Sequence, residues 1–142
     1  MLPKHHRLSA VEVRLVLKNG VGDLIEAMPY LPRQVTLQVY GTGYLQETLE
    51  QKVRQLDLAD RVRFFGHVAP EDLPSKLAQA SVFCRPSLSE GQGISFLEAM
   101  AIGLPTVGTS VGGIVDFLHN PSDESGLLAT GWLCEPKNPK SI

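Results

Sequence analysis

Two acidic residues flank a glycine-containing loop in the second half of the chain, where they could bind a ligand. Glu90 precedes Gly91 and Gly93, and Glu98 lies in the apolar run that follows, which we expect to form a helix over residues 94–102. The N–H groups of a helix's first turn and the positive end of its dipole favour an anion such as a phosphate. Glycine lets a ligand approach the backbone closely.

Glu98 would lie roughly 7–8 Å further along this helix than its first turn, at a rise of 1.5 Å per residue. It therefore suits a pair of hydroxyl groups, from which a carboxylate can accept two hydrogen bonds, rather than the same anion. An anion site with two carboxylates nearby predicts a site for a sugar joined to a nucleoside diphosphate. The alternative, in which Glu90 caps a turn and Glu98 is a solvated helix residue, stays open at this point.

Strand and helix signals alternate through the chain and indicate how this loop is positioned. Strands are expected over 11–17, 35–40, 62–65, 82–84, 106–108 and within 131–134, and helices over 21–28, 45–56, 70–80, 94–102 and 114–118. This alternation predicts a Rossmann-like α/β fold, an open parallel sheet with helices on both faces. In such sheets ligands bind beyond the carboxyl ends of the strands, where the glycine-containing loops lie. Residues 139–142 look like the start of a further helix, so we interpret the chain as a fragment that lacks its last helix.

Length and composition favour one globular domain and exclude several classes of protein. The 142 residues suit a single domain, here residues 11–142, after a mobile segment over 1–10. A net charge of −2 and a pI near 6.1 argue against a nucleic-acid partner. No apolar run is long enough to span a bilayer, and no signal peptide is evident. Cys84 and Cys134 are too few for a disulfide framework and are expected to be free thiols in a reducing cytoplasm.

The stretch from Pro86 to Pro105 closely resembles the signature of the retaining GT-B glycosyltransferases of family four. That signature has a Glu-x7-Glu pair within a pattern like PS-x-x-E-x-x-G-x-x-x-x-E-A-M-A-x-G-x-P, and Glu90 and Glu98 fit it in register. Residues 41–43, 62–68 and 109–114 match further family patterns in family order. The resemblance implies that the chain is the C-terminal, donor-binding half of a GT-B architecture.

The resemblance also implies roles for individual residues. Glu98 would hold the ribose hydroxyls and Glu90 the donor sugar, while His67 and Val68 would lie beside the base. Arg14 matches the arginine that the family uses on the diphosphate, and Lys18 is a second candidate cation there. Arg14, Lys18 and Glu90 are the expected catalytic residues. The backbone of the loop and of the following turn would bind the sugar and the diphosphate, through Gly91, Gln92, Gly93, Ile94 and Ser95.

Two residues depart from the family pattern at the diphosphate end. Val13 stands where the family usually has glycine, and Asn19 stands where it usually has lysine, with Lys18 one place earlier. A neutral amide donates hydrogen bonds but cannot neutralise phosphate charge. These departures favour an alternative in which the chain is a degenerate donor-binding subunit that acts with a partner chain.

The expected reaction is transfer of a hexosyl group from a UDP-sugar or GDP-sugar to an acceptor hydroxyl, with retention at the anomeric carbon. No Asp-x-Asp pair is present, so no metal or other cofactor is expected. The expected partner is an N-terminal acceptor-binding domain or subunit, and any membrane association would come through that missing part, at the inner face.

Two alternative classes of protein fit the sequence less well. A nucleotide-sugar epimerase or phosphorylase lacks the full signature, and a nicotinamide-binding domain would need a glycine at Gln46.

Overall fold

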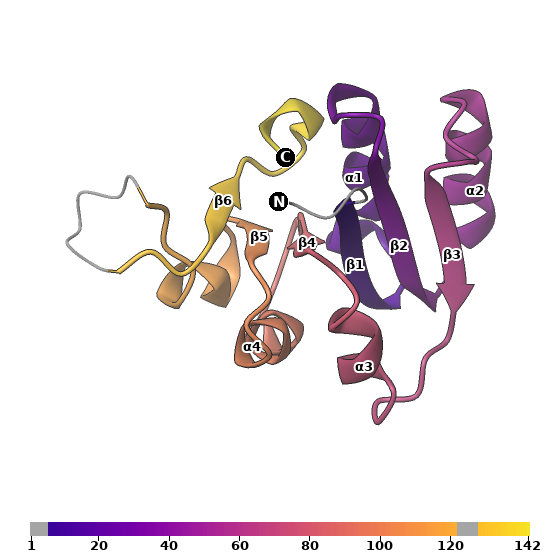
Figure 1. Cartoon of the computed structure of the whole chain (residues 1–142). Helices are drawn as coiled ribbons and strands as arrows, with labels where there is room; N and C mark the ends of the chain where they lie inside the picture. The colour runs from indigo at the N-terminus through magenta and orange to yellow at the C-terminus, as the bar shows by residue number, and fades with distance from the viewer. Residues whose placement is uncertain (1–5, 122–127) are drawn as a thin grey trace.

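The computed structural model describes residues 6–121 and 128–142, which form a parallel sheet covered by helices (Figure 1). The strands are β1 (His6–Arg14), β2 (Val35–Thr42), β3 (Val62–Gly66), β4 (Val82–Arg85), β5 (Thr106–Thr109) and β6 (Trp132–Cys134). Their order across the sheet is β3-β2-β1-β4-β5-β6, and every pair is parallel. This confirms the predicted Rossmann-like fold class. The strand order reverses between β1 and β4, and the crevice at such a switch point is where ligands bind in open α/β sheets.

The first strand begins earlier than the sequence analysis predicted. Residues 6–10, assigned there to a mobile segment, lie in β1, which is central and pairs with a strand on each side. His6 is opposite Val35 of β2, and Leu8 is opposite both Leu37 of β2 and Val82 of β4. Backbone pairing on both sides holds this segment in the sheet, although its polar residue types do not resemble a buried strand. The predicted boundary at residue 11 is therefore wrong, and residues 1–5 lie outside the described part of the chain.

The helices largely follow the predicted apolar periodicity. The α-helices are α1 (Val21–Ala27), α2 (Gln46–Gln55), α3 (Leu73–Leu77) and α4 (Ile94–Ala101), and the 3₁₀ helices are η1 (Leu17–Asn19), η2 (Met28–Tyr30), η3 (Gly112–Asp116) and η4 (Pro139–Ser141). Two predictions differ from the structure. The helix expected over 114–118 is the 3₁₀ helix η3, and the helix expected over 70–80 is only the five residues of α3.

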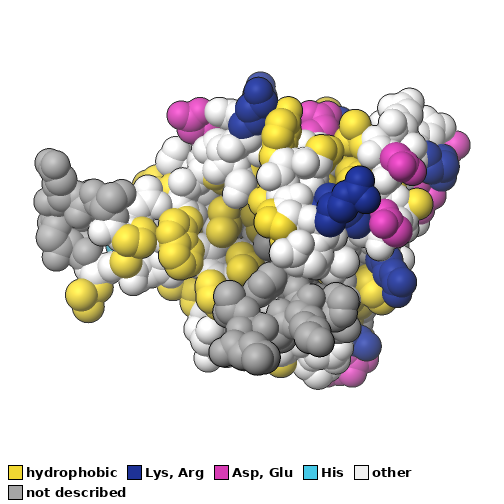
Figure 2. All heavy atoms as spheres, turned by 45° about the horizontal axis from the view of Figure 1, so that its top comes forward, with side chains coloured by type: hydrophobic (Ala, Val, Ile, Leu, Met, Phe, Trp, Pro, Cys, Tyr) yellow, Lys and Arg dark blue, Asp and Glu magenta, His cyan; other side chains and the backbone are white. Residues whose placement is uncertain are grey.

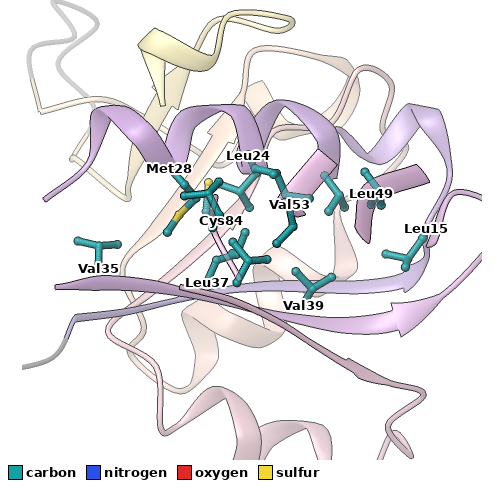
Figure 3. Close-up of a cluster of buried hydrophobic side chains, with 13 residues drawn as sticks. Leu15, Leu24, Met28, Val35, Leu37, Val39, Leu49, Val53 and Cys84 are labelled. Carbon is teal, nitrogen blue, oxygen red and sulfur yellow. The ribbon is translucent and has the colours of Figure 1, made fainter. Parts of the chain in front are cut away.

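Buried side chains form two clusters on opposite faces of the sheet. Successive residues of a strand point to opposite faces, and the neighbours Phe83 and Cys84 of β4 belong to different clusters. The cluster that contains Cys84 includes side chains of α1 and α2, with Leu24 and Met28 facing β2 in Figure 3. The cluster that contains Phe83 includes side chains of α3 and α4. These layers hold α4 and its preceding loop against the carboxyl end of β4.

The outer surface shows no strong segregation of charge in the view of Figure 2, where Lys and Arg side chains are interspersed with Asp and Glu. In the two described ranges, no helix has the length and apolar character that crossing a bilayer requires.

Candidate functional site

A cavity of about 480 Å³ opens beside the carboxyl ends of β2, β3 and β4. Its walls come from strand ends, from the segment that leads into α3, from the loop before α4 and from α4 itself; α3 and α4 contact each other at this end of the molecule (Figure 1). The lining residues are Tyr40, Gly41, His67, Val68, Pro70, Leu73, Arg85, Glu90, Gln92, Gly93, Ile94, Ser95 and Glu98.

Most residues proposed from the sequence line this cavity together. They are Glu90, Glu98, His67, Val68, Gln92, Gly93, Ile94 and Ser95. Gly91, Arg14 and Lys18 are not among the lining residues, and the side chains of Arg14 and Lys18 are exposed. The roles assigned to all of these residues remain predictions.

The loop between β4 and α4 is held by the turn that contains η3. The Gly113 N–H donates to the Gly91 carbonyl at 3.0 Å. Gly112 has φ +52°, and a Cβ atom there would collide with the Glu90 carbonyl oxygen. Only glycine at position 112 therefore allows this close backbone approach, which sets where the Glu90 backbone lies.

The first turn of α4 begins at a residue that also requires glycine. Gly93 is the N-cap with φ +69°, and a Cβ atom there would lie 2.7 Å from Ile114 Cδ1. Phe96 and Ala99 bury the inner face of the helix, whereas Ser95 and Glu98 lie on the cavity side. A spacing of three residues puts these last two side chains on one face of a helix. The start of α4, where the first N–H groups of a helix lack partners within the helix, thus opens into the cavity.

Arg85 is the charged lining residue that sequence reasoning missed. It is the last residue of β4, its side chain is 12% exposed, and its Nη1 donates to Ser95 Oγ at 2.6 Å. Its Nη2 donates to Asn19 Oδ1 at 2.9 Å and lies 3.3 Å from Glu90 Oε2. The available signal was a charged residue that ends the otherwise apolar strand Val-Phe-Cys-Arg.

Asn19 connects the loop after β1 to this guanidinium. It is 2% exposed, and its Nδ2 donates to the Arg14 carbonyl at 2.8 Å. The loop after β4 is held to the same segment, because the Leu88 N–H donates to the Lys18 carbonyl at 2.6 Å. Asn19, which replaces the lysine that the family usually has, is therefore a buried, hydrogen-bonded residue beside the cavity.

Glu90 and Tyr40 are two further residues of the cavity lining. Glu90 has an 11% exposed side chain and accepts a hydrogen bond from Ser87 Oγ at 3.0 Å. The ring of Tyr40 stacks on Phe65 with centroids 5.0 Å apart, next to the segment that carries His67. Within the described part of the chain, no cluster of three or more His, Cys, Asp or Glu residues could hold a metal ion.

Comparison with known proteins gives one family. The family model described as glycosyl transferases group 1 matches residues 4–142. A GDP-mannose-dependent alpha-(1-6)-phosphatidylinositol monomannoside mannosyltransferase of Mycobacterium tuberculosis is 35% identical over 128 residues, which cover 83% of this chain and 33% of the relative. The chain therefore spans about a third of the length of such relatives.

Solved structures show the same similarity in three dimensions. The Anabaena protein HepE, in complex with UDP and glucose, superposes with a TM-score of 0.84 at 26% identity, covering 97% of this chain and 36% of that one. The C-terminal domain of a glycosyl transferase group 1 family protein from Francisella tularensis superposes with a TM-score of 0.79 at 25% identity, covering 94% of this chain and 70% of that one.

Proposed function

The chain belongs to the glycosyl transferases group 1 family, and from this premise we propose that its cavity binds a nucleotide sugar as the donor of a retaining glycosyltransferase. One observation carries the proposal. Glu90, Glu98 and the start of α4 line a single cavity at the carboxyl ends of the strands. The cavity thus combines an anion-binding helix terminus with carboxylates suited to hydroxyl groups.

In this proposal each part of the donor is bound by different residues of the cavity lining. Glu98 accepts hydrogen bonds from the ribose hydroxyls, and Glu90 accepts them from the transferred sugar. The first turn of α4 binds the diphosphate, and His67 and Val68 lie beside the base. The nucleotides to test first are GDP and UDP, because the mycobacterial relative is named as GDP-mannose-dependent and HepE was solved with UDP.

The proposed reaction transfers a hexosyl group to an acceptor hydroxyl with retention. The leaving diphosphate gains negative charge in the transition state, so fixed cations and the amides of α4 are the groups that lower the barrier. We propose that no metal is needed, because protein cations and helix amides can meet this charge. The acceptor would be bound by a further N-terminal domain or subunit.

A calorimetric titration of the purified chain with UDP, GDP and ADP tests the donor site. We expect one nucleotide to bind, and Glu98→Ala to weaken it by about 1–3 kcal/mol through loss of the ribose contacts. The same titration in EDTA should give the same affinity. Failure of all three nucleotides to bind wild type would refute the donor-site proposal, and a loss of binding in EDTA would refute the metal-independent part alone.

A second candidate is a non-catalytic donor-binding module that acts with a partner chain. The neutral side chain of Asn19, where the family usually has lysine, favours it. Both candidates predict nucleotide binding. They differ in turnover, so a transfer assay of this chain with its acceptor-binding partner distinguishes them.

We further propose that the protein works in the cytoplasm. Cys84 and Cys134 are buried free thiols, as is usual for proteins of a reducing compartment. Fractionation of cells that express the tagged protein tests this location, and recovery of the protein outside the cytoplasm and its membrane surface would contradict it.

A further inference from the structure

A diphosphate in this cavity needs a positive charge close to it. An anion removed from water without a cation or several hydrogen-bond donors loses far more solvation than the contact returns. Among the described residues that line the cavity, Arg85 alone is Lys or Arg. The side chains of Arg14 and Lys18, the cations expected from the sequence, are exposed and are not among the lining residues.

Arg85 is placed where the strand order of the sheet would put a phosphate. It ends β4, and β4 neighbours β1 at the point where the order reverses. Its guanidinium reaches the first turn of α4, where Nη1 donates to Ser95 Oγ at 2.6 Å. The fixed positive charge and the positive end of the helix dipole therefore converge on one wall of the cavity.

We propose that Arg85 is the cation that binds the donor's diphosphate, and that the buried Asn19 positions it. The proposal rests on the donor-binding function proposed above and assigns its charge to a residue outside the family signature. A guanidinium suits this task because its planar fork can donate two parallel hydrogen bonds to phosphate oxygens.

Asn19 has the chemistry of a partner for Arg85. Its Oδ1 accepts from Arg85 Nη2 at 2.9 Å, and its Nδ2 donates to the Arg14 carbonyl at 2.8 Å. The amide thus ties the guanidinium to the end of β1 without adding charge. A lysine at the same buried position would put a second cation against Arg85, and the two charges would repel each other. A cation at position 85 therefore favours a neutral residue at position 19.

Glu90 completes the charge balance of the cavity. Its Oε2 lies 3.3 Å from Arg85 Nη2, and the two side chains are 11% and 12% exposed. When the diphosphate binds, its negative charge replaces that of Glu90 as the charge that neutralises the Arg85 guanidinium. Glu90 keeps its hydrogen bond from Ser87 Oγ, at 3.0 Å here, and its other acceptor sites turn to the sugar hydroxyls.

The test compares a nucleoside with its diphosphate. Uridine and UDP, and guanosine and GDP, are titrated into wild type, Arg85→Gln, Lys18→Gln and the distant control Arg54→Gln, an exposed residue in the last turn of α2. We expect Arg85→Gln to weaken the nucleoside diphosphate about 10- to 100-fold and to leave the nucleoside within about twofold, because a charge-assisted contact to phosphate is lost. A purely structural role for Arg85 would weaken both ligands equally.

The outcomes separate this inference from the proposed function. If wild type binds none of these ligands, both fail. If wild type prefers the diphosphate and Arg85→Gln keeps that preference, or Lys18→Gln loses more of it, only the assignment to Arg85 fails. Should Arg85→Gln not fold, the nearly isosteric Asn19→Asp decides instead: its carboxylate would neutralise Arg85 and is expected to reduce the preference about tenfold, whereas an unchanged preference would overturn the assignment.

Discussion

Replacing Asn19 by lysine distinguishes a damaged phosphate site from a rebuilt one. Lysine is the residue that the family usually has at this position, so a chain that had merely lost its cation should bind the donor better once lysine is restored. The structure leads to the opposite expectation. The position is 2% exposed, and its side chain contacts the Arg85 guanidinium at 2.9 Å.

The size of the effect follows from this contact. Two like charges about 4 Å apart repel by about 4 kcal/mol at an effective dielectric constant near 20. The hydrogen bond that Asn19 accepts from Arg85 is lost as well, which adds about 1.5–3 kcal/mol for a bond to a charged group. Because the lysine side chain is long and can turn partly toward solvent, we expect a net loss of about 3 kcal/mol in the free energy of unfolding.

Urea unfolding and nucleotide titration of Asn19→Lys check this expectation. The matched control is Gln34→Lys, which adds the same charge at an exposed position just before β2. We expect Asn19→Lys to lower both the free energy of unfolding and the affinity for the nucleoside diphosphate, and Gln34→Lys to change neither. A variant with unchanged stability and tighter binding would refute the pairing of Asn19 with Arg85.

Two further predictions concern the loop and the buried thiols. Gly112→Ala should weaken donor binding about tenfold or more, because the new Cβ would displace the Glu90 carbonyl. The control is Gly22→Ala, whose Cβ would meet nothing nearer than 3.8 Å and which should leave α1 unchanged or stabilise it by up to about 1 kcal/mol. Nucleotide titration and thermal unfolding of both variants test this prediction. Burial raises the pKa of the Cys134 thiol to about 11 and also raises that of Cys84. As pH rises, a thiol therefore ionises in the unfolded chain before it ionises in the folded chain. The buried thiols contribute fully to the free energy of unfolding below about pH 8.5, the pKa of an unfolded thiol. Above that pH, each thiol should lower the free energy of unfolding by about 1.4 kcal/mol per pH unit until its folded pKa is reached. Stability differences between wild type and Cys134→Ala that stay constant from about pH 8 to 10.5 would contradict this.

The fold class could be predicted because the chain's local patterns agree with its tertiary structure. Leu49 and Val53 mark the buried face of α2 at helical spacing, and both are buried as that pattern predicts. The start of β1 could not be found in this way. Its strand character comes from pairing with β2 and β4, which are distant in sequence, and residue types in 6–10 carry no signal of those partners.

The residues of the candidate site also differ in whether local sequence patterns could identify them. Glu90 and Glu98 could be found because their spacing around the loop carries the chemistry in one short stretch. Arg85 could not, because its significance lies in contacts with Asn19, from the loop after β1, and Ser95, from α4. A single sequence shows a charged residue at the end of a strand but not which distant side chains surround it.

The parallel pairing of β1 with β4 also has a consequence for how the chain folds. Leu8 is opposite Val82, so this pairing must bring together segments that are separated by half of the chain, whereas β2 pairs with its sequence neighbours β1 and β3. Non-local parallel pairings close large loops and form slowly. Since Arg85 and Asn19 meet only across this junction, we expect the cavity that Arg85 lines to be completed only when β1 and β4 pair. A ligand that binds this cavity only in the folded chain would stabilise the β1–β4 pairing by an amount that rises with the logarithm of its concentration over its dissociation constant, so the dependence of the unfolding rate on ligand concentration would report on this pairing.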